Sequence, residues 1–400
     1  MFNQFRLDAW SSGVRSQLAL PLRIELWNGR HLDFSAEPPR VTIRIPNPQA
    51  IRYLLRPSLD SLGQAYVEGA IDVTGRAVDM IAVVNALAAT TMRRRGRLAR
   101  GLRAVTHTRA RDAAAIRYHY DVSNDFYGAW LDSDMVYSCA YFETGHEDLA
   151  SAQRKKIDHI LRKIDLRPGQ RLLDIGCGWG ALVRRAASHY GAHCVGITLS
   201  ENQCQLAREQ VARAGLQRQV EIRLQDYRDV QGQFERITSV GMFEHVGLRH
   251  LSDYFARVNA LLAPGGLAMN HGITTTDIQN GSAPYGGGEF IERYVFPHGE
   301  LAHLGTVLRA MQEGGLEARD VENLRRHYAR TCALWTDNFE ARADQIRKLT
   351  DARRFRIWHV YLAGCAYAFK QDWISLYQIV CGKAGADPAT LPWSRRYMYP

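Results

Sequence analysis

The chain has 400 residues, of which 46% are hydrophobic and 23% charged, and its 51 basic and 41 acidic residues give a formal net charge of +10 at pH 7. This ordinary globular composition excludes a largely disordered chain, and no apolar run reaches the roughly 18 residues that a membrane-spanning helix needs. The positive charge favours an anionic partner, which could be a nucleic acid, a phospholipid surface or a phosphorylated small molecule.

Seven cysteines are scattered along the sequence without a C-x-x-C pair. This spacing argues against a disulfide framework and against a structural zinc site, so we expect no metal centre. The N-terminal residues also lack the basic and apolar pattern of a signal peptide. Together these features predict a protein of the reducing cytoplasm.

Residues 1–92 are predicted to form a small mixed α/β domain. The segments 23–27 and 41–45 alternate with the period of a strand, and Asn28-Gly29 is a hairpin signal. From Ser58 onward the pattern is helical, and Asp79 is the expected N-cap of a helix over residues 80–91.

Residues 93–117 contain nine arginines and a single acidic residue, Asp112. The nearest aromatic residues, Tyr118 and Tyr120, both follow this run, so a stacking platform for single-stranded nucleic acid is not indicated. We interpret the segment as a basic linker, which is either a solvated connection between domains or a surface that attracts anionic lipid.

Residues 118–400 alternate between strand and helix patterns, which predicts a doubly wound parallel sheet with helices on both faces. The expected strands are 171–175, 193–197, 220–224, 236–240 and 267–271. The expected helices are 181–190, 201–214, 251–262 and 298–313, and the tail over 334–380 is also expected to be helical. The fold class is therefore α/β.

A glycine loop follows the first of these strands, after Asp174, with glycines at positions 176, 178 and 180. A nicotinamide fingerprint would need G-x-G-x-x-G and an acid about 20 residues later, and a P-loop would need Gly-Lys-Ser or Gly-Lys-Thr; neither pattern is present. An acid at the strand end before alternating glycines looks like the S-adenosylmethionine loop of Rossmann-like methyltransferases.

Polar residues also follow the next two strands. Ser200 and Gln203 form an S-x-x-Q capping box, in which each side chain is expected to bond the other residue's backbone. Gln225, Asp226 and Tyr227 close the third strand, where Asp226 either bonds an adenine amino group or is a turn acid. Capping and cofactor binding are compatible, because a cofactor would lie over these strand ends.

Six motifs in order resemble the cyclopropane-fatty-acyl-phospholipid synthase family, relatives of the mycolic acid cyclopropane synthases: Tyr118–Tyr127, Tyr137–Phe142, the glycine loop, Gly196–Ser200, Gly241–Gly247 and Tyr294–Gly299. The resemblance covers about residues 110–380 and, more loosely, 58–84. It implies a Rossmann-like class I methyltransferase with helical lipid-binding additions and a lipid-associated N-terminal domain. The cofactor-binding residues that it implies are Tyr137, Ser138, Asp174, Gly176, Gly178, Gly180, Thr198, Leu199, Ser200, Gln203, Gln225, Asp226 and Tyr227.

The same resemblance implies a bound bicarbonate that acts as the general base, held by Cys139, Glu244, His271, the Ile273 backbone and Tyr328. Taken singly, each residue also has a structural interpretation, such as a small buried thiol for Cys139 or a helix-start acid for Glu244. Cys365 was a nucleophile candidate by family analogy, but it lies on an apolar helical stretch and has no role in this chemistry, so we interpret it as a core residue.

The implied function is transfer of a methylene group from S-adenosylmethionine across a cis double bond of unsaturated phospholipid acyl chains. We expect a peripheral protein on the inner face of the membrane that favours anionic lipid, binds no nucleic acid and forms a homodimer. Two alternatives stay open. One is a lipid methyltransferase that gives a methyl-branched or hydroxylated product, and the other is a non-catalytic lipid- and cofactor-binding protein.

Overall fold

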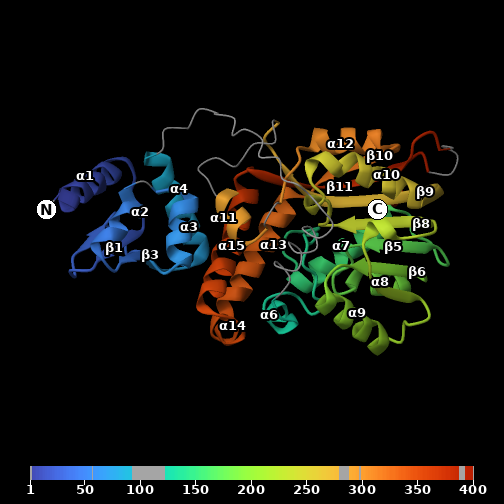
Figure 1. Cartoon of the computed structure of the whole chain (residues 1–400), viewed down its shortest axis with the longest axis horizontal. Coiled ribbons are helices and arrows are strands. Elements are labelled where there is room, and N and C mark those ends of the chain that lie inside the picture. Colours follow the sequence, from blue (N-terminus) through green and yellow to red (C-terminus); the bar gives the residue numbers. More distant parts are fainter. Residues whose placement is uncertain are drawn as a thin grey trace. The chain divides into compact units, whose positions relative to one another are not determined.

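The computed structural model describes residues 2–55, 57–91, 122–278, 288–296, 299–386 and 392–399. The predicted linker over 93–117 lies outside these residues. The chain divides into two compact units, which are described separately (Figure 1). The first unit comprises Met1–Arg103, Gly281–Pro297 and Cys332–Gln371, and the second comprises Ala104–Asn280, His298–Thr331 and Asp372–Pro400.

The first unit contains a four-stranded sheet in the order β2-β1-β3-β4, in which β1 is parallel to β3 and antiparallel to β2. The strands are β1 (Leu22–Leu26), β2 (His31–Asp33), β3 (Val41–Ile45) and β4 (Asp72–Thr74). The helices are α1 (Phe2–Gln17), α2 (Ile51–Leu55), α3 (Leu59–Val67), α4 (Ala77–Thr91), α11 (Gly288–Tyr294), α14 (Ala343–Leu349) and α15 (Ala352–Lys370). Helix α13 (Arg325–Ala341) begins in the second unit and ends in the first.

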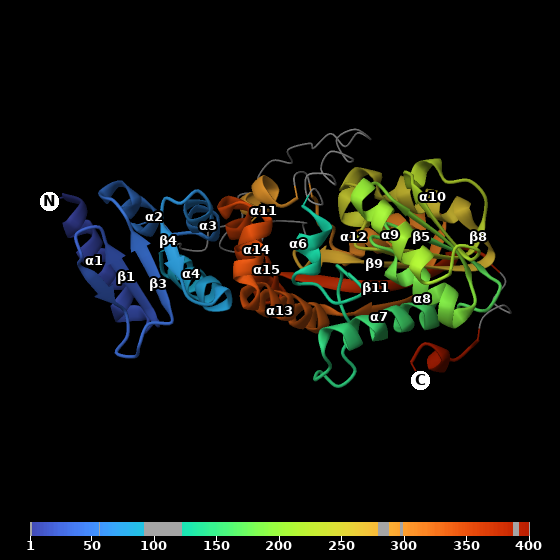
Figure 2. The ribbon, with the colours of Figure 1, turned by 90° about the horizontal axis from the view of Figure 1, so that it is seen from below.

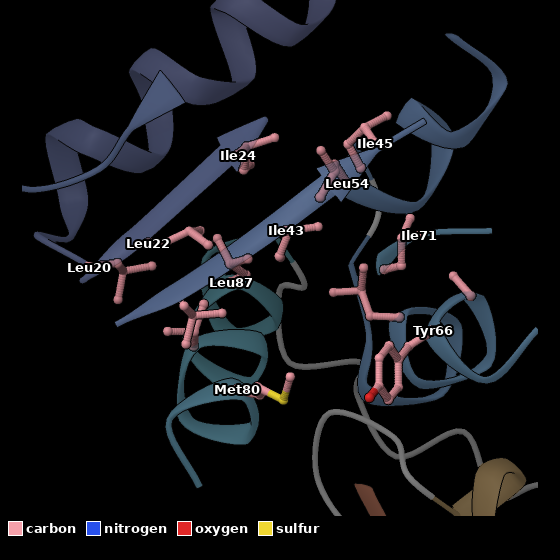
Figure 3. Packing of buried hydrophobic residues seen from close by; sticks show 14 of the residues in the cluster. Leu20, Leu22, Ile24, Ile43, Ile45, Leu54, Tyr66, Ile71, Met80 and Leu87 are labelled. Carbon is pink, nitrogen blue, oxygen red and sulfur yellow. The ribbon is translucent and has the colours of Figure 1, made fainter. Parts of the chain in front are cut away.

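The core of the four-stranded sheet is built from alternate strand residues, which explains the period seen in the sequence. Ile24 and Ile43 face the helices and meet Met80 and Leu87 of α4 in one buried cluster (Figure 3). Burial of such side chains is worth about 1.5–3 kcal/mol each.

The prediction that Asp79 caps α4 is wrong. The helix begins two residues earlier, at Ala77, and Asp79 lies in its first turn. The Ala77 backbone N–H donates to Glu340 Oε1 at 2.7 Å, so a residue distant in sequence satisfies the helix start.

The second unit is built on a seven-stranded sheet in the order β10-β11-β9-β8-β5-β6-β7 (Figure 1). The five strands from β9 to β7 are parallel, and β11 is antiparallel to both of its neighbours. The strands are β5 (Arg171–Ile175), β6 (His193–Thr198), β7 (Val220–Leu224), β8 (Phe234–Val240), β9 (Leu262–Thr275), β10 (Leu316–Asn323) and β11 (Ile374–Lys383). The predicted α/β class with a Rossmann-like methyltransferase sheet is confirmed.

Helices cover both faces of this sheet. On one face, α7 (Leu149–Lys163), α8 (Ala181–Tyr190) and α9 (Glu201–Arg213) pack against a cluster that includes Leu172. On the other, α10 (Leu251–Leu261) and α12 (Leu304–Glu313) pack against a cluster that includes Leu173. Adjacent residues of one strand thus reach opposite layers, and Figure 2 shows α7 and α10 on opposite sides of the sheet. Among the described residues of this unit, the short α-helix α6 (Asn124–Gly128) precedes α7.

Two elements of the C-terminal half differ from the prediction. The tail is helical only to Lys370, after which Ile374–Lys383 forms β11 between β9 and β10. A strand paired on both edges and covered on both faces loses the alternation that identifies strands, so its apolar residues resembled a helix. Helix α12 begins at Leu304 behind the N-cap His303, later than the predicted residue 298, which lies outside the described residues.

Within the described ranges, no helix has the length and apolar character that crossing a membrane requires.

Candidate active site

The glycine loop turns the chain from β5 into α8 in a conformation that favours glycine. Gly176, Gly178 and Gly180 have φ values of 79°, 53° and 81°, in the left-handed region. A Cβ added to Gly180 would lie 3.3 Å from Ala207 Cβ of α9, so this glycine also allows the loop to approach that helix. The loop is therefore shaped for a sharp turn with its backbone exposed to a ligand.

A cavity of about 440 Å³ opens at the carboxyl ends of β5, β6, β7 and β8. Eleven of the thirteen cofactor residues implied by the resemblance line it: Tyr137, Ser138, Asp174, Gly176, Gly178, Thr198, Leu199, Gln203, Gln225, Asp226 and Tyr227. Gly180 and Ser200 do not line it and instead serve the start of α8 and α9 as N-caps. The cavity is thus the candidate cofactor site.

Two buried charged groups lie in this cavity. Asp174 Oδ1 accepts a hydrogen bond from Thr238 Oγ1 at 2.7 Å, and burial raises the pKa of Asp174 from 3.8 to about 6. Lys156 of α7 is 2% exposed, and burial lowers its pKa from 10.5 to about 8. Its Nζ donates to Ser138 Oγ at 2.8 Å.

The predicted capping box after β6 is half formed. Ser200 Oγ accepts from the Gln203 backbone N–H at 3.3 Å, as expected. The Gln203 side chain does not return to the Ser200 backbone; its Oε1 accepts from Thr198 Oγ1 at 2.9 Å instead. Thr198 Oγ1 in turn accepts from the Ser200 N–H, which is the hydrogen bond that the Gln203 side chain was expected to make. Thr198 and Gln203 therefore face the cavity as a bonded pair.

Asp226 is a turn acid, as one of the two interpretations from the sequence predicted, and its bond to an adenine amino group stays a prediction. It caps the short helix Tyr227–Asp229 through the Arg228 N–H and forms a two-pronged ion pair with the Arg228 side chain. It also lines the cavity.

The segment Val136–Phe142 carries Tyr137, Ser138 and Cys139 and is held from two sides. Helix α7 holds it through Gln153, whose Nε2 donates to the Ser138 carbonyl at 2.8 Å, and through Lys156. Helix α13 holds it through Thr331, whose Oγ1 accepts from the Ala140 N–H at 3.0 Å. The residues of this motif thus owe their positions to two helices that are far apart in the sequence.

Glu244, His271 and Ile273 lie together at the end of β9. The Ile273 N–H, predicted to bind bicarbonate, donates to Glu244 Oε1 at 2.7 Å. His271 precedes Ile273 by two residues on the strand, so both face the same side. Burial raises the pKa of Glu244 from 4.5 to about 7 and lowers the pKa of His271 well below 6.5. His271 is therefore neutral at pH 7.

Cys139 and Tyr328 meet at one carbonyl group. Cys139 Sγ lies 3.9 Å from the Leu324 oxygen, and the Tyr328 N–H donates to the same oxygen at 3.0 Å. The Leu324 N–H donates to Leu376 of β11, which pairs in register with Ile273. Leu324, which Cys139 and Tyr328 contact, is therefore separated from Ile273 by strand β11. Burial raises the pKa of the Cys139 thiol, which is protonated at pH 7.

Comparison with known proteins gives the family. A model described as mycolic acid cyclopropane synthetase matches residues 107–379. The chain belongs to this family. A second model, of a domain of unknown function, matches residues 9–95. The proteins that the chain matches include a cyclopropane-fatty-acyl-phospholipid synthase and a mycolic acid cyclopropane synthase with bound SAH, and the chain is an S-adenosylmethionine-dependent methyltransferase that acts on lipids, as the resemblance implied.

Relatives of the cyclopropane synthetase family differ in their named products. The chain is 46% identical over 385 residues to a probable fatty acid methyltransferase of Pseudomonas putida, covering 96% of this chain and 97% of the relative. It is 35% identical to the cyclopropane-fatty-acyl-phospholipid synthase of Escherichia coli K12, covering 84% and 87%. Among solved structures, the chain matches the crystal structure of mycolic acid cyclopropane synthase CmaA1 complexed with SAH and CTAB, with a TM-score of 0.64 and 34% sequence identity. The match covers 68% of this chain and 98% of that chain.

The sequence did not single out several residues that line the cavity, including Lys156, Trp179 and Arg257. Lys156 had no signal, because it follows Arg154 and Lys155 in an ordinary amphipathic helix. Trp179 could have been found, since it lies inside the glycine loop. Cys365 belongs to α15 of the first unit, and burial raises the pKa of its thiol to about 12. A thiol with that pKa is protonated at neutral pH and is a poor nucleophile.

Proposed function

We propose that this chain is a cyclopropane-fatty-acyl-phospholipid synthase in which bicarbonate is the general base. The observation that supports the base is a pair of buried polar atoms: among the described residues, Glu244 Oε2 and His271 Nε2 have no hydrogen-bond partner. Leaving a buried polar group unpaired costs about 1–3 kcal/mol. A small polar ligand that satisfies both atoms is therefore favoured at this place.

Bicarbonate has the donor and acceptor groups that these atoms require. Gln378 Nε2 lies 3.2 Å from His271 Nδ1, and because an amide nitrogen only donates, Nδ1 accepts and Nε2 of the neutral ring carries the hydrogen. Nε2 then donates to an oxyanion, while Glu244 Oε2 accepts from a hydroxyl group. Bicarbonate offers both, and when bound it would supply a base for the proton that must leave the new methyl group.

Glu244 and His271 have separate roles in this proposal. The Ile273 N–H fixes one oxygen of Glu244 and thereby directs the other oxygen toward the anion. In its ionised form Glu244 accepts the bicarbonate proton, and His271 orients the anion without adding charge. We place Cys139 and Tyr328 in the same anion site, as the family resemblance implies. S-adenosylmethionine supplies the electrophilic methyl group from the neighbouring cavity.

A methyl-branched product is the second candidate, because the relative that is 46% identical is named a fatty acid methyltransferase. Both products start with the same methyl transfer, which leaves a carbocation in the chain. Loss of a proton from the new methyl group closes the ring, whereas loss of a proton from a chain carbon leaves a methyl-branched alkene. Ring closure needs a base beside the new methyl group, and the unpaired Glu244 and His271 atoms favour it.

Lipid analysis distinguishes the two products. The chain would be expressed in a bacterial host that lacks cyclopropane lipids, and its phospholipids analysed by mass spectrometry and proton NMR. Cyclopropanation adds the mass of one CH2 group, removes the alkene signals and adds the upfield ring-methylene signal. Retained alkene or methyl-branch signals would contradict the proposal. If unsaturated phospholipid vesicles with bicarbonate yield no S-adenosylhomocysteine, the proposed phospholipid substrate is wrong, and the alternative of a non-catalytic lipid- and cofactor-binding protein is favoured.

We further propose that the chain acts as a peripheral protein and homodimer on the inner membrane face. The net charge of +10 supports attraction to anionic lipid, at about 1 kcal/mol for each Lys or Arg near the surface. Binding to vesicles should increase with anionic lipid content and decrease with salt. Binding that does not depend on salt would contradict the electrostatic part, and ultracentrifugation would test the dimer.

A further inference from the structure

The cofactor cavity contains a buried lysine with a single hydrogen bond. Lys156 Nζ donates to Ser138 Oγ at 2.8 Å, and this is its one hydrogen bond to the residues that the structure describes. An ammonium group has three N–H donors, so two remain. Among the described residues, Lys156 forms no ion pair within 4 Å, although the Cys139 thiol and the carboxyl groups of Asp132 and Asp174 lie close enough to act on its charge.

The two nearby carboxyl groups accept hydrogen bonds from other groups. Asp174 Oδ1 accepts from Thr238 Oγ1. Asp132 accepts from the backbone N–H groups of Asp134 and Val136, both at 3.0 Å. A buried cation without a contacting counter-charge is costly, and burial accordingly lowers the pKa of Lys156 to about 8. A ligand that brings a negative charge would remove this cost.

The bond from Lys156 also fixes what Ser138 can do. Because the ammonium group only donates, Ser138 Oγ is the acceptor, and the hydroxyl hydrogen must point away from Lys156. Both residues line the cavity, so together they offer it a positive charge and a hydroxyl donor. This combination suits a carboxylate.

The other cationic side chains of the cavity are engaged at its opposite, β7 side. Arg228 pairs with Asp226, and Arg257 donates to the carbonyl groups of Tyr227 and Val230. S-adenosylmethionine carries one anionic group, the carboxylate of its methionine moiety. We propose that Lys156 and Ser138 bind this carboxylate, which directs the methionine end of the cofactor toward α7; the proposal rests on the assignment of this cavity to the cofactor.

The test compares two ligands that differ in one group: S-adenosylhomocysteine and its decarboxylated analogue. Their affinities for the purified full-length chain would be measured by titration calorimetry. Lys156→Met should weaken S-adenosylhomocysteine at least about tenfold, the effect of losing a charged hydrogen bond, and leave the decarboxylated analogue unchanged. Ser138→Ala should shift the same ratio by a smaller factor.

Lys155→Met is the matched control, because Lys155 is the next residue on α7 and bonds Glu143 and Glu147 outside the cavity. It should change neither affinity. If Lys156→Met weakens both ligands equally, the lysine only shapes the cavity and the proposal is wrong; unchanged affinities also overturn it. If the unaltered chain binds neither ligand, the assignment of the cavity to the cofactor fails instead. Retained binding of the decarboxylated analogue shows that each variant is folded.

Discussion

Replacing Glu244 with glutamine should stabilise the ligand-free protein above neutral pH while reducing its activity. Burial raises the pKa of this carboxyl from 4.5 to about 7, so the folded protein holds a proton that the unfolded chain releases. The stability of the wild-type protein is therefore complete below pH 4.5, falls as the pH rises toward 7, and is constant above it. At 1.36 kcal/mol per pKa unit, the loss is about 3 kcal/mol.

Glu244→Gln removes this titration and keeps an oxygen to accept the Ile273 N–H. Urea unfolding would be followed between pH 4 and pH 8 in bicarbonate-free buffer. The variant should match the wild type near pH 4 and exceed it by about 3 kcal/mol at pH 8, while its rate of S-adenosylhomocysteine release falls strongly. A stability difference that does not change with pH would refute the reasoning.

Glu322→Gln is a control for which the opposite effect on stability is expected, because the pKa of Glu322 is lowered in the folded protein. Burial acts to raise the pKa of Glu322, but the hydrogen bond from His159 and the charge of Lys163 hold this pKa below its usual value. Lys163 is fully buried and lies 2.9 Å from this carboxylate. Glu322→Gln should therefore destabilise the protein at neutral pH, because it leaves a buried lysine with one fewer charged partner.

Three further substitutions test the site and its supports. Thr331→Ala should lower the free energy of unfolding in urea by about 1–3 kcal/mol and reduce turnover, because it leaves the buried Ala140 N–H unpaired. Unchanged turnover would show that α13 does not position Tyr137, Ser138 and Cys139 for the reaction. Gly272→Ala should lower the melting temperature sharply, since its Cβ would overlap the Phe243 ring; a stable variant would show that the ring can move. Cys365→Ala should leave the rate of S-adenosylhomocysteine release unchanged, and a loss of turnover would restore the thiol as a candidate.

Local patterns determined much of the cofactor site. The five parallel strands were found because each contains a short apolar run, although β9 extends over Leu262–Thr275 and not only 267–271. The glycine loop was found because a sharp turn beside a ligand requires glycine. The family resemblance implied thirteen cofactor residues, and eleven of them line one cavity. Those that follow β5, β6 and β7 lie together because the carboxyl ends of parallel strands gather at one edge of the sheet. These features depend on the order of neighbouring residues, which the sequence contains.

The tertiary structure alone decided how distant residues are paired. Strand β11 resembled a helix because burial on both faces removes the alternation of a strand. Lys156 gave no signal, because its proposed role depends on its hydrogen bond to Ser138, eighteen residues away. The pKa of Glu244 is raised by burial, which the sequence does not show. Desolvation and hydrogen bonding depend on the three-dimensional surroundings of a group, and these are set only when the chain is folded.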